Sequence, residues 1–129
     1  MASEALHEPS DKLKPETINI HRAIVSLMEE LEAIDWYRQR ADACTDTHLR
    51  AILEHNMNEE IEHASMALEW IRRNVAKFDE ALKTYLFTTG NVVEIEEAVD
   101  AGEKQSGKGA VVTDDRSTMR STIGNMKGS

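Results

Sequence analysis

Three residues combine the side-chain types and spacing that metal chemistry needs: Glu30, Glu60 and His63. Glu60 and His63 form a Glu-x-x-His pair, and a spacing of three residues on a helix directs both side chains toward one point. A buried carboxylate without a partner is costly, whereas a bound metal ion stabilises it. The pair therefore predicts a metal site, with Glu30 as a third ligand from another helix.

The neighbours of these residues separate a metal site from an ordinary acidic helix face. A mostly apolar line passes through the pair at steps of three or four residues, comprising Leu49, Leu53, Asn56, Glu60, His63, Ala67 and Trp70. Glu30 likewise follows Leu27 by three residues and precedes Ile34 by four, so it borders an apolar stripe. Tyr37 lies seven residues after Glu30, two helical turns along the same face. Polar ligands on a line that should be buried favour metal binding.

The elements that must position these residues are helices. Both prolines precede residue 16 and all six glycines lie at Gly90 or beyond, so residues 16–89 hold no strong helix breaker. We predict helices over residues 15–43, 48–73 and 76–87, with Thr45 or Asp46 capping the second. The fold class is therefore all-α: an antiparallel two-helix hairpin plus a short C-terminal helix.

Composition divides the chain into three parts. Residues 1–15 are predicted to be a flexible N-terminus, and residues 16–90 the helical domain. Residues 91–129 are predicted to be a flexible linker and tail, with a helical turn or two in VVEIEEAVD before the polar run GEKQSGKGAVVTDDRS.

One hairpin supplies only half of a familiar ligand set. Four-helix di-iron proteins use a Glu from each of two helices and a Glu-x-x-His motif from each of the other two. This chain carries the set once, so a homodimer would complete both the bundle and the site. Four carboxylates and two imidazoles suit Fe(II), although ligand type alone leaves zinc open. The expected reaction is oxidation of Fe(II) by dioxygen or peroxide.

The charge balance narrows the classes of partner. The chain has 24 acidic and 15 basic residues, a net charge of −9, which argues against nucleic acid and anionic membranes. The single cysteine, Cys44, rules out an internal disulfide and fits a reducing cytosol. The N-terminal residues do not resemble a signal peptide, and no apolar run reaches the roughly 20 residues of a membrane span. We therefore expect a soluble, cytoplasmic protein.

Two stretches resemble a known family. The runs HRAIVSLMEELEAIDWYRQRADA and ILEHNMNEEIEHASMALEWIRRN are similar to encapsulated ferritin, the two-helix cargo of encapsulin nanocompartments, over about residues 7–90. The resemblance implies a ferritin-like four-helix bundle made by a dimer, and a ring-shaped decamer made of five dimers. It implies ferroxidase activity at a di-iron centre, with Glu30, Glu60 and His63 as ligands and Tyr37 beside them.

The same resemblance implies a second site and a shell partner. It assigns Glu29, Glu32 and Trp36 to a second divalent cation site, for Ca²⁺ or iron, at another subunit interface. The tail STIGNMKG resembles the targeting peptides that dock cargo on the inner wall of encapsulin, with Ile123 and Met126 as apolar anchors. The oxidised iron would then be stored inside the encapsulin nanocompartment.

Two other functions stay open. The metal site could be structural, in a non-catalytic metal-binding or assembly module. A rubrerythrin-like peroxidase would share the ligand set, but such proteins commonly add a rubredoxin-type cysteine site, and a single cysteine argues against it.

Overall fold

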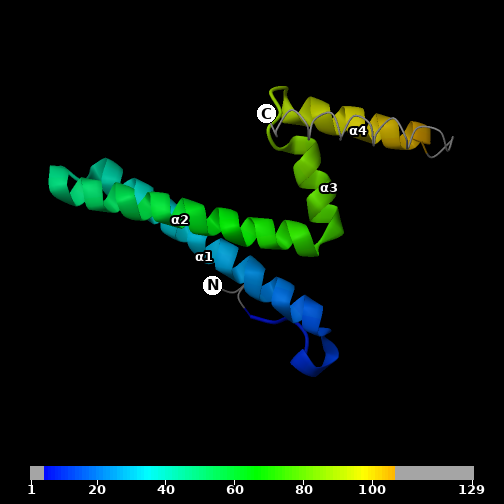
Figure 1. Ribbon diagram of the computed structural model, residues 1–129, viewed down its shortest axis with the longest axis horizontal. Helices are drawn as coiled ribbons and strands as arrows, with labels where there is room; N and C mark the ends of the chain where they lie inside the picture. The colour runs from blue at the N-terminus through cyan, green and yellow to red at the C-terminus, as the bar shows by residue number, and fades with distance from the viewer. Residues whose placement is uncertain (1–4, 107–129) are drawn as a thin grey trace. The chain divides into compact units, whose positions relative to one another are not determined.

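The computed structural model describes residues 5–106, and these residues are helical without strands. A short 3-10 helix, η2 (Ser10–Lys12), precedes the α-helices α1 (Pro15–Ala43), α2 (Thr47–Asn74), α3 (Ala76–Tyr85) and α4 (Val92–Ser106) (Figure 1). The predicted all-α class is confirmed for this part of the chain. None of the described helices is both long and apolar enough to span a membrane.

The ends of the two long helices follow from local chemistry. Pro15 occupies the first turn of α1, where its missing N–H is not needed. α2 begins one residue before the predicted start, and Asp46 is its cap: the Asp46 Oδ1 accepts a hydrogen bond from the Leu49 N–H at 2.8 Å. Of the two predicted caps, Asp46 is therefore the correct one.

Helices α1 and α2 pack along one another as an antiparallel hairpin (Figure 1). Their contact buries Ala41, Ala64 and Ile71, which are 6%, 7% and 1% exposed. The Arg50 Nε donates a hydrogen bond to the Ala41 carbonyl at 3.0 Å and ties the start of α2 to the end of α1. The small alanine side chains let the two helices approach closely.

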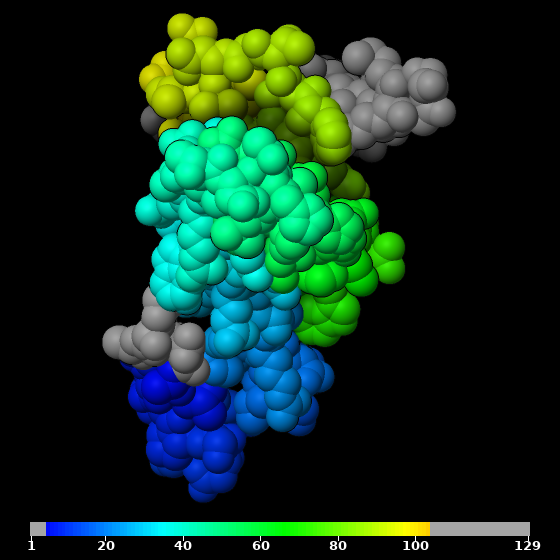
Figure 2. Space-filling view, turned by 90° about the vertical axis from the view of Figure 1, so that its left-hand side faces the viewer, coloured from blue at the N-terminus to red at the C-terminus, as the bar shows by residue number. Residues whose placement is uncertain are grey.

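A hairpin of two helices leaves much apolar surface uncovered. Figure 2 shows one face of the molecule, coloured by residue number. Within the hairpin, the exposed large apolar side chains are Ile24, Leu31, Trp36, Leu49, Ile52, Ile61, Met66 and Trp70. Several of these residues belong to the apolar stripes that the sequence predicted to face inward, so one copy of the chain does not bury them.

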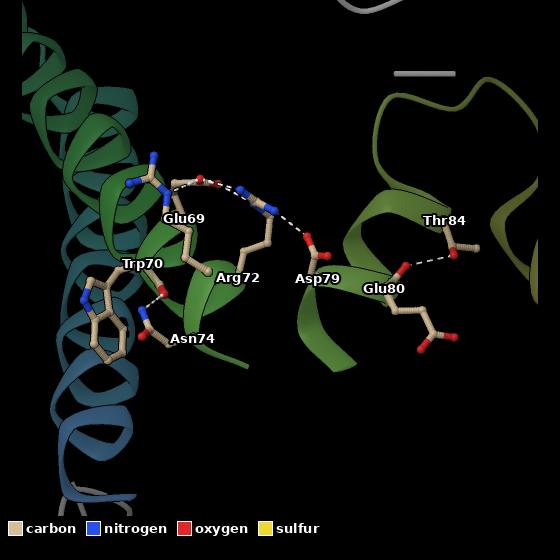
Figure 3. A network of polar contacts seen from close by, with 8 residues as sticks. Glu69, Trp70, Arg72, Asn74, Asp79, Glu80 and Thr84 are labelled. Atoms are coloured by element: carbon tan, nitrogen blue, oxygen red, sulfur yellow. Dashed lines mark hydrogen bonds and ion pairs between the residues drawn. The ribbon is translucent and has the colours of Figure 1, made fainter. Parts of the chain in front are cut away.

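A network of charged side chains joins the end of α2 to the start of α3 (Figure 3). The Glu69 carboxylate accepts hydrogen bonds from Arg72 Nε, Arg72 Nη2 and Arg73 Nε, each at 2.7 Å. The Arg72 Nη1 also pairs with Asp79, in α3. Arg72 and then Arg73 lower the pKa of Glu69 to about 2, and Glu69 and Asp79 raise the pKa of Arg72. These ion pairs stabilise the turn between α2 and α3.

The chain divides into two compact units, with the boundary between Asp79 and Glu80 inside α3. In the second unit, α3 ends at Tyr85, two residues before the predicted end, and Phe87 has a positive φ of 62°. Such a left-handed conformation cannot continue a helix, which explains the earlier end.

Helix α4 is longer than the sequence predicted. Instead of one or two turns it extends from Val92 to Ser106 and takes in the first part of the polar run assigned to a linker. The Asn91 side chain caps it by accepting from the N–H groups of Val93 and Glu94, at 2.9 and 3.3 Å. Gly102 costs a helix about 1 kcal/mol, which this capped helix tolerates. The predicted tail at residues 121–128 lies outside the described residues.

Candidate metal centre

The hairpin brings together the three residues that the sequence selected. Glu30 comes from α1, and Glu60 and His63 come from α2. The His63 Nδ1 lies 3.4 Å from Glu60 Oε2 and 3.8 Å from Glu30 Oε2. The potential ligand atoms of the three residues all lie within 4.8 Å of one another. Among residues 5–106, no other group of three or more such side chains meets this criterion.

The local sequence explains why these side chains converge. Glu60 and His63 are one turn apart on α2, so they project to the same side. Ala64 follows His63 and is buried against the hairpin contact at 7% exposed. Its small side chain allows α1 to lie close, and Glu30 on α1 thereby reaches His63. The carboxylates are 26% exposed and the imidazole is 49% exposed, so the cluster opens to the surface of the single chain.

The cluster is electrostatically unbalanced. A hydrogen bond between the two carboxyl groups raises the pKa of Glu30 and lowers the pKa of Glu60, and partial burial adds to the rise at Glu30. Ionising both carboxyl groups together is therefore unfavourable, and Glu30 is the harder of the two to ionise. In the part of the chain that the structure describes, His63 is the one basic side chain that pairs with either carboxylate. A cation placed among these atoms would relieve the repulsion between the two carboxylates.

The distances fit a metal ion. Carboxylate oxygens and imidazole nitrogens bind ions such as Zn²⁺ at about 2.0–2.2 Å, so two ligands of one ion are separated by no more than about 4.4 Å. The separations of 3.4 and 3.8 Å between His63 and the two carboxylates lie below this limit. Two oxygen donors and one nitrogen donor suit Fe(II) or Zn²⁺. Three ligands leave coordination positions open for a second chain, water or an oxidant.

Tyr37 does not join the three-residue cluster. It is partly covered, two turns beyond Glu30 on the same face of α1. The Arg40 Cζ lies 5.6 Å from the centre of its ring and 6.0 Å from the centre of the Trp36 ring. Arg40 was not among the residues predicted from the sequence, although an arginine three and four residues after an aromatic pair is a visible signal on a helix.

The residues of the predicted second cation site also stay apart from the cluster. Glu29 is exposed, Glu32 is half-buried, and Trp36 is 49% exposed. Within residues 5–106 of one chain these side chains form no group of three potential ligands. Since the predicted second site needs another subunit, it stays a prediction.

Comparison with known proteins gives the family. Residues 5–89 match the model of the EncFtn-like family. The chain is 57% identical to the encapsulated ferritin-like protein of Rhodospirillum rubrum, over 98% of this chain and 91% of that protein. It is 39% identical to the encapsulin nanocompartment cargo protein EncC of Myxococcus xanthus, over 58% of this chain and 62% of that protein.

A solved structure agrees with this relationship. The crystal structure of a Nitrosomonas europaea protein matches with a TM-score of 0.66 and 56% identity, covering 68% of this chain and 97% of that one. A ferritin-like protein of Thermotoga maritima is 48% identical, over 81% of this chain and 92% of its own length. The helical hairpin, its three converging ligands and these relatives agree, and the chain belongs to the EncFtn-like family, as its two sequence runs predicted.

Proposed function

We propose that this protein is a ferroxidase, which oxidises Fe(II) to Fe(III) at a di-iron centre formed between two copies of the chain. The observation that carries the proposal is the convergence of Glu30, Glu60 and His63 within 4.8 Å, without an arginine or lysine paired to either carboxylate in the described residues. The ferritin-like names of the Rhodospirillum and Thermotoga relatives favour iron as the metal.

The need for two copies rests on ligand number and on the surface around the site. Three side chains are too few for two irons, and His63 is 49% exposed. On α2, Ile52 lies three turns before His63 and Trp70 two turns after it, and these residues are 44% and 39% exposed. A second copy seated on this face would cover both and gain about 25 cal/mol for each Å² of apolar surface buried. A dimer would form a four-helix bundle with two ligand sets.

Iron is the substrate in this proposal, and each chain residue has a defined task. Each of two Fe(II) ions gives up one electron, and dioxygen or peroxide accepts both. Glu30 and Glu60 bind iron as carboxylates, and their charges stabilise the ferric product. His63 supplies the nitrogen ligand. Tyr37, on the same face of α1, would donate a hydrogen bond or an electron nearby.

The direct test is anaerobic loading followed by admission of air. The purified chain receives two Fe(II) per dimer without oxygen, and ferric absorbance is then followed against iron in buffer alone. A ferroxidase oxidises the iron faster than buffer does. A chain that binds Fe(II) but gives no acceleration is instead a structural metal-binding or assembly module.

The proposed site of action is inside an encapsulin shell, with the oxidised iron stored there. The Myxococcus relative is named as an encapsulin nanocompartment cargo protein. Ile123 and Met126 of the tail, outside the described residues, would dock the chain on the shell. Co-expression with the shell protein tests this: deletion of residues 114–129 should abolish co-purification, and unchanged loading would exclude the tail as the docking segment.

The assembly proposed from the family resemblance is a ring-shaped decamer of five dimers, in which Glu29, Glu32 and Trp36 face another subunit as a second cation site. Native mass measurement of the iron-loaded protein tests the subunit number. Substitution of Glu32 by Gln should remove a separate class of bound Ca²⁺ or iron and leave the ions at Glu60 and His63 in place.

A further inference from the structure

Arg40 lies over two aromatic rings in the last turn of α1. Its Cζ atom is 5.6 Å from the centre of the Tyr37 ring and 6.0 Å from the centre of the Trp36 ring. Both values are within the roughly 6 Å over which a cation is attracted to a ring face. Spacings of three and four residues put Tyr37 and Trp36 on the helix surface beside Arg40, so one guanidinium serves both.

The chemistry of this contact is specific to arginine. Any cation in the last turn of α1 is stabilised by the negative end of the helix dipole, and a lysine would serve that purpose equally well. The flat, weakly hydrated guanidinium also stacks on aromatic faces, which an ammonium group does less well. The two ring contacts therefore distinguish a role in ring packing from a role in charge alone.

The two rings differ in where they lie on the helix. Tyr37 is partly covered, on the face of α1 that carries Glu30, whereas Trp36 is 49% exposed and one residue around the helix. We propose that Arg40 is a positioning residue: by stacking on Tyr37 and Trp36 it holds the Tyr37 phenol on the side of the metal cluster. The inference rests on the proposed function in one respect, namely that Tyr37 takes part in iron oxidation.

The first experiment observes the rings without iron. The chain has two tyrosines, so protein labelled with 3-fluorotyrosine gives two ¹⁹F resonances, assigned with a Tyr85→Phe variant. Arg40→Met should move the Tyr37 resonance toward that of an unstructured tyrosine and leave the Tyr85 resonance in place. Arg40→Lys should give an intermediate shift. A Tyr37 resonance that is unchanged in Arg40→Met would overturn the stacking.

The matched control is Arg38, an exposed arginine two residues earlier that lines an open polar groove with Asp35 and Asp42. Among the described residues, no aromatic ring lies within cation–π distance of its guanidinium. Arg38→Met should therefore leave both fluorine resonances and the iron oxidation rate unchanged. An equal effect of both substitutions would mean that lost charge, rather than ring contact, is responsible, and the proposal would be wrong.

The second experiment connects the rings to turnover. Arg40→Met should lower the maximal rate of Fe(II) oxidation about two- to fivefold, the value of an exposed cation–π contact. The Fe(II) concentration at half-maximal rate should not change, because the metal ligands are intact. In a Tyr37→Phe background, Arg40→Met should cause no further loss.

Three outcomes would contradict either the role of Arg40 or the proposed ferroxidase function. If Arg40→Met slows the Tyr37→Phe variant by the same factor as the wild type, Arg40 does not act through Tyr37 and the proposal fails. A fully active Tyr37→Phe variant would overturn it as well. If the wild type does not oxidise iron, the proposed function fails, while the fluorine spectra still decide whether Arg40 fixes the Tyr37 ring.

Discussion

Two clusters of charged side chains on α2 differ in how their carboxylates are balanced. Glu69 of the arginine network follows His63 of the candidate metal centre by only six residues. In the network at the end of the helix, Glu69 faces the guanidinium groups of Arg72 and Arg73, and its pKa falls to about 2. In the candidate metal centre, Glu30 and Glu60 face each other, and the pKa of Glu30 is raised. Both clusters contain two carboxylates from neighbouring helices, since Asp79 joins the first.

The difference shows that charge balance, rather than the number of acidic residues, marks a metal site. The carboxylates of Glu69 and Asp79 are already neutralised by arginine, so a cation gains little there. Among the described residues, Glu30 and Glu60 have only the His63 imidazole as a basic neighbour. A bound metal ion would stabilise the carboxylates of Glu30 and Glu60, whereas it would add little to those of Glu69 and Asp79.

The largest effect is expected from removal of the ligands. Glu60→Ala combined with His63→Ala should reduce Fe(II) oxidation by more than about 100-fold, since even groups that only support metal ligands are worth 10- to 100-fold. Stopped-flow absorbance measures the rate. Glu69→Gln, which removes a carboxylate charge on the same helix, is the control and should retain the wild-type rate. Loss of activity in both variants would mean that the contrast between the clusters is wrong.

The next effect concerns assembly of the site. Ile52→Glu places a charge on the apolar face that carries His63, so it should weaken dimerisation and make activity strongly dependent on protein concentration. Dilution series of the oxidation rate, with mass determined by light scattering, measure this. Ser65→Glu introduces the same charge two residues beyond His63, on the far side of α2, and should leave the concentration dependence unchanged. A dimer that tolerates Ile52→Glu would remove this face from the proposed interface.

A smaller effect is a change in melting temperature, which should have opposite signs in the two clusters. At pH 7, Glu30→Gln should raise the melting temperature of the metal-free protein by about 1–4 °C, because a carboxyl whose folded pKa is raised loses stability as the pH rises above its unfolded value. Glu69→Gln should lower the melting temperature, since Glu69 loses its arginine partners. Differential scanning calorimetry after removal of metal measures both. The same sign in both variants would contradict the assigned charge balance.

The smallest effect is the pH dependence of the arginine network. The folded pKa of Glu69 is about 2, against 4.5 for an ordinary glutamate, so its stabilising contribution is complete above pH 4.5 and disappears as the pH falls toward 2. The difference in melting temperature between wild type and Glu69→Gln should accordingly be constant from pH 8 to 5 and shrink below that. A difference that already shrinks between pH 7 and 5 would show that Arg72 and Arg73 do not hold Glu69 in solution.

Local rules explain why much of the hairpin could be predicted. Pro15 is favoured in the first turn of a helix, and Asp46 caps the second helix. Residues 16–89 contain no glycine or proline, so helix is the favoured state along both segments. The apolar stripes then force the two helices together, and Glu-x-x-His spacing aims two ligands at one point. The full length of helix α4 was not predicted, because the glycine and polar composition of its second half are also typical of linkers and the Asn91 cap is a weak signal in isolation.

The sequence by itself determined the ligand types, their spacing on each helix and the family, because these depend on chemistry within one turn and on similarity along the chain. Only the tertiary structure decided that Glu30 reaches His63, since this contact joins residues 33 positions apart and depends on how closely α1 approaches at Ala64. The tertiary structure also decided that Arg72 forms an ion pair with Asp79, and that the Arg40 guanidinium lies over the rings of Trp36 and Tyr37. Sequence spacing allows such pairs, but distance and rotamer determine which of them form.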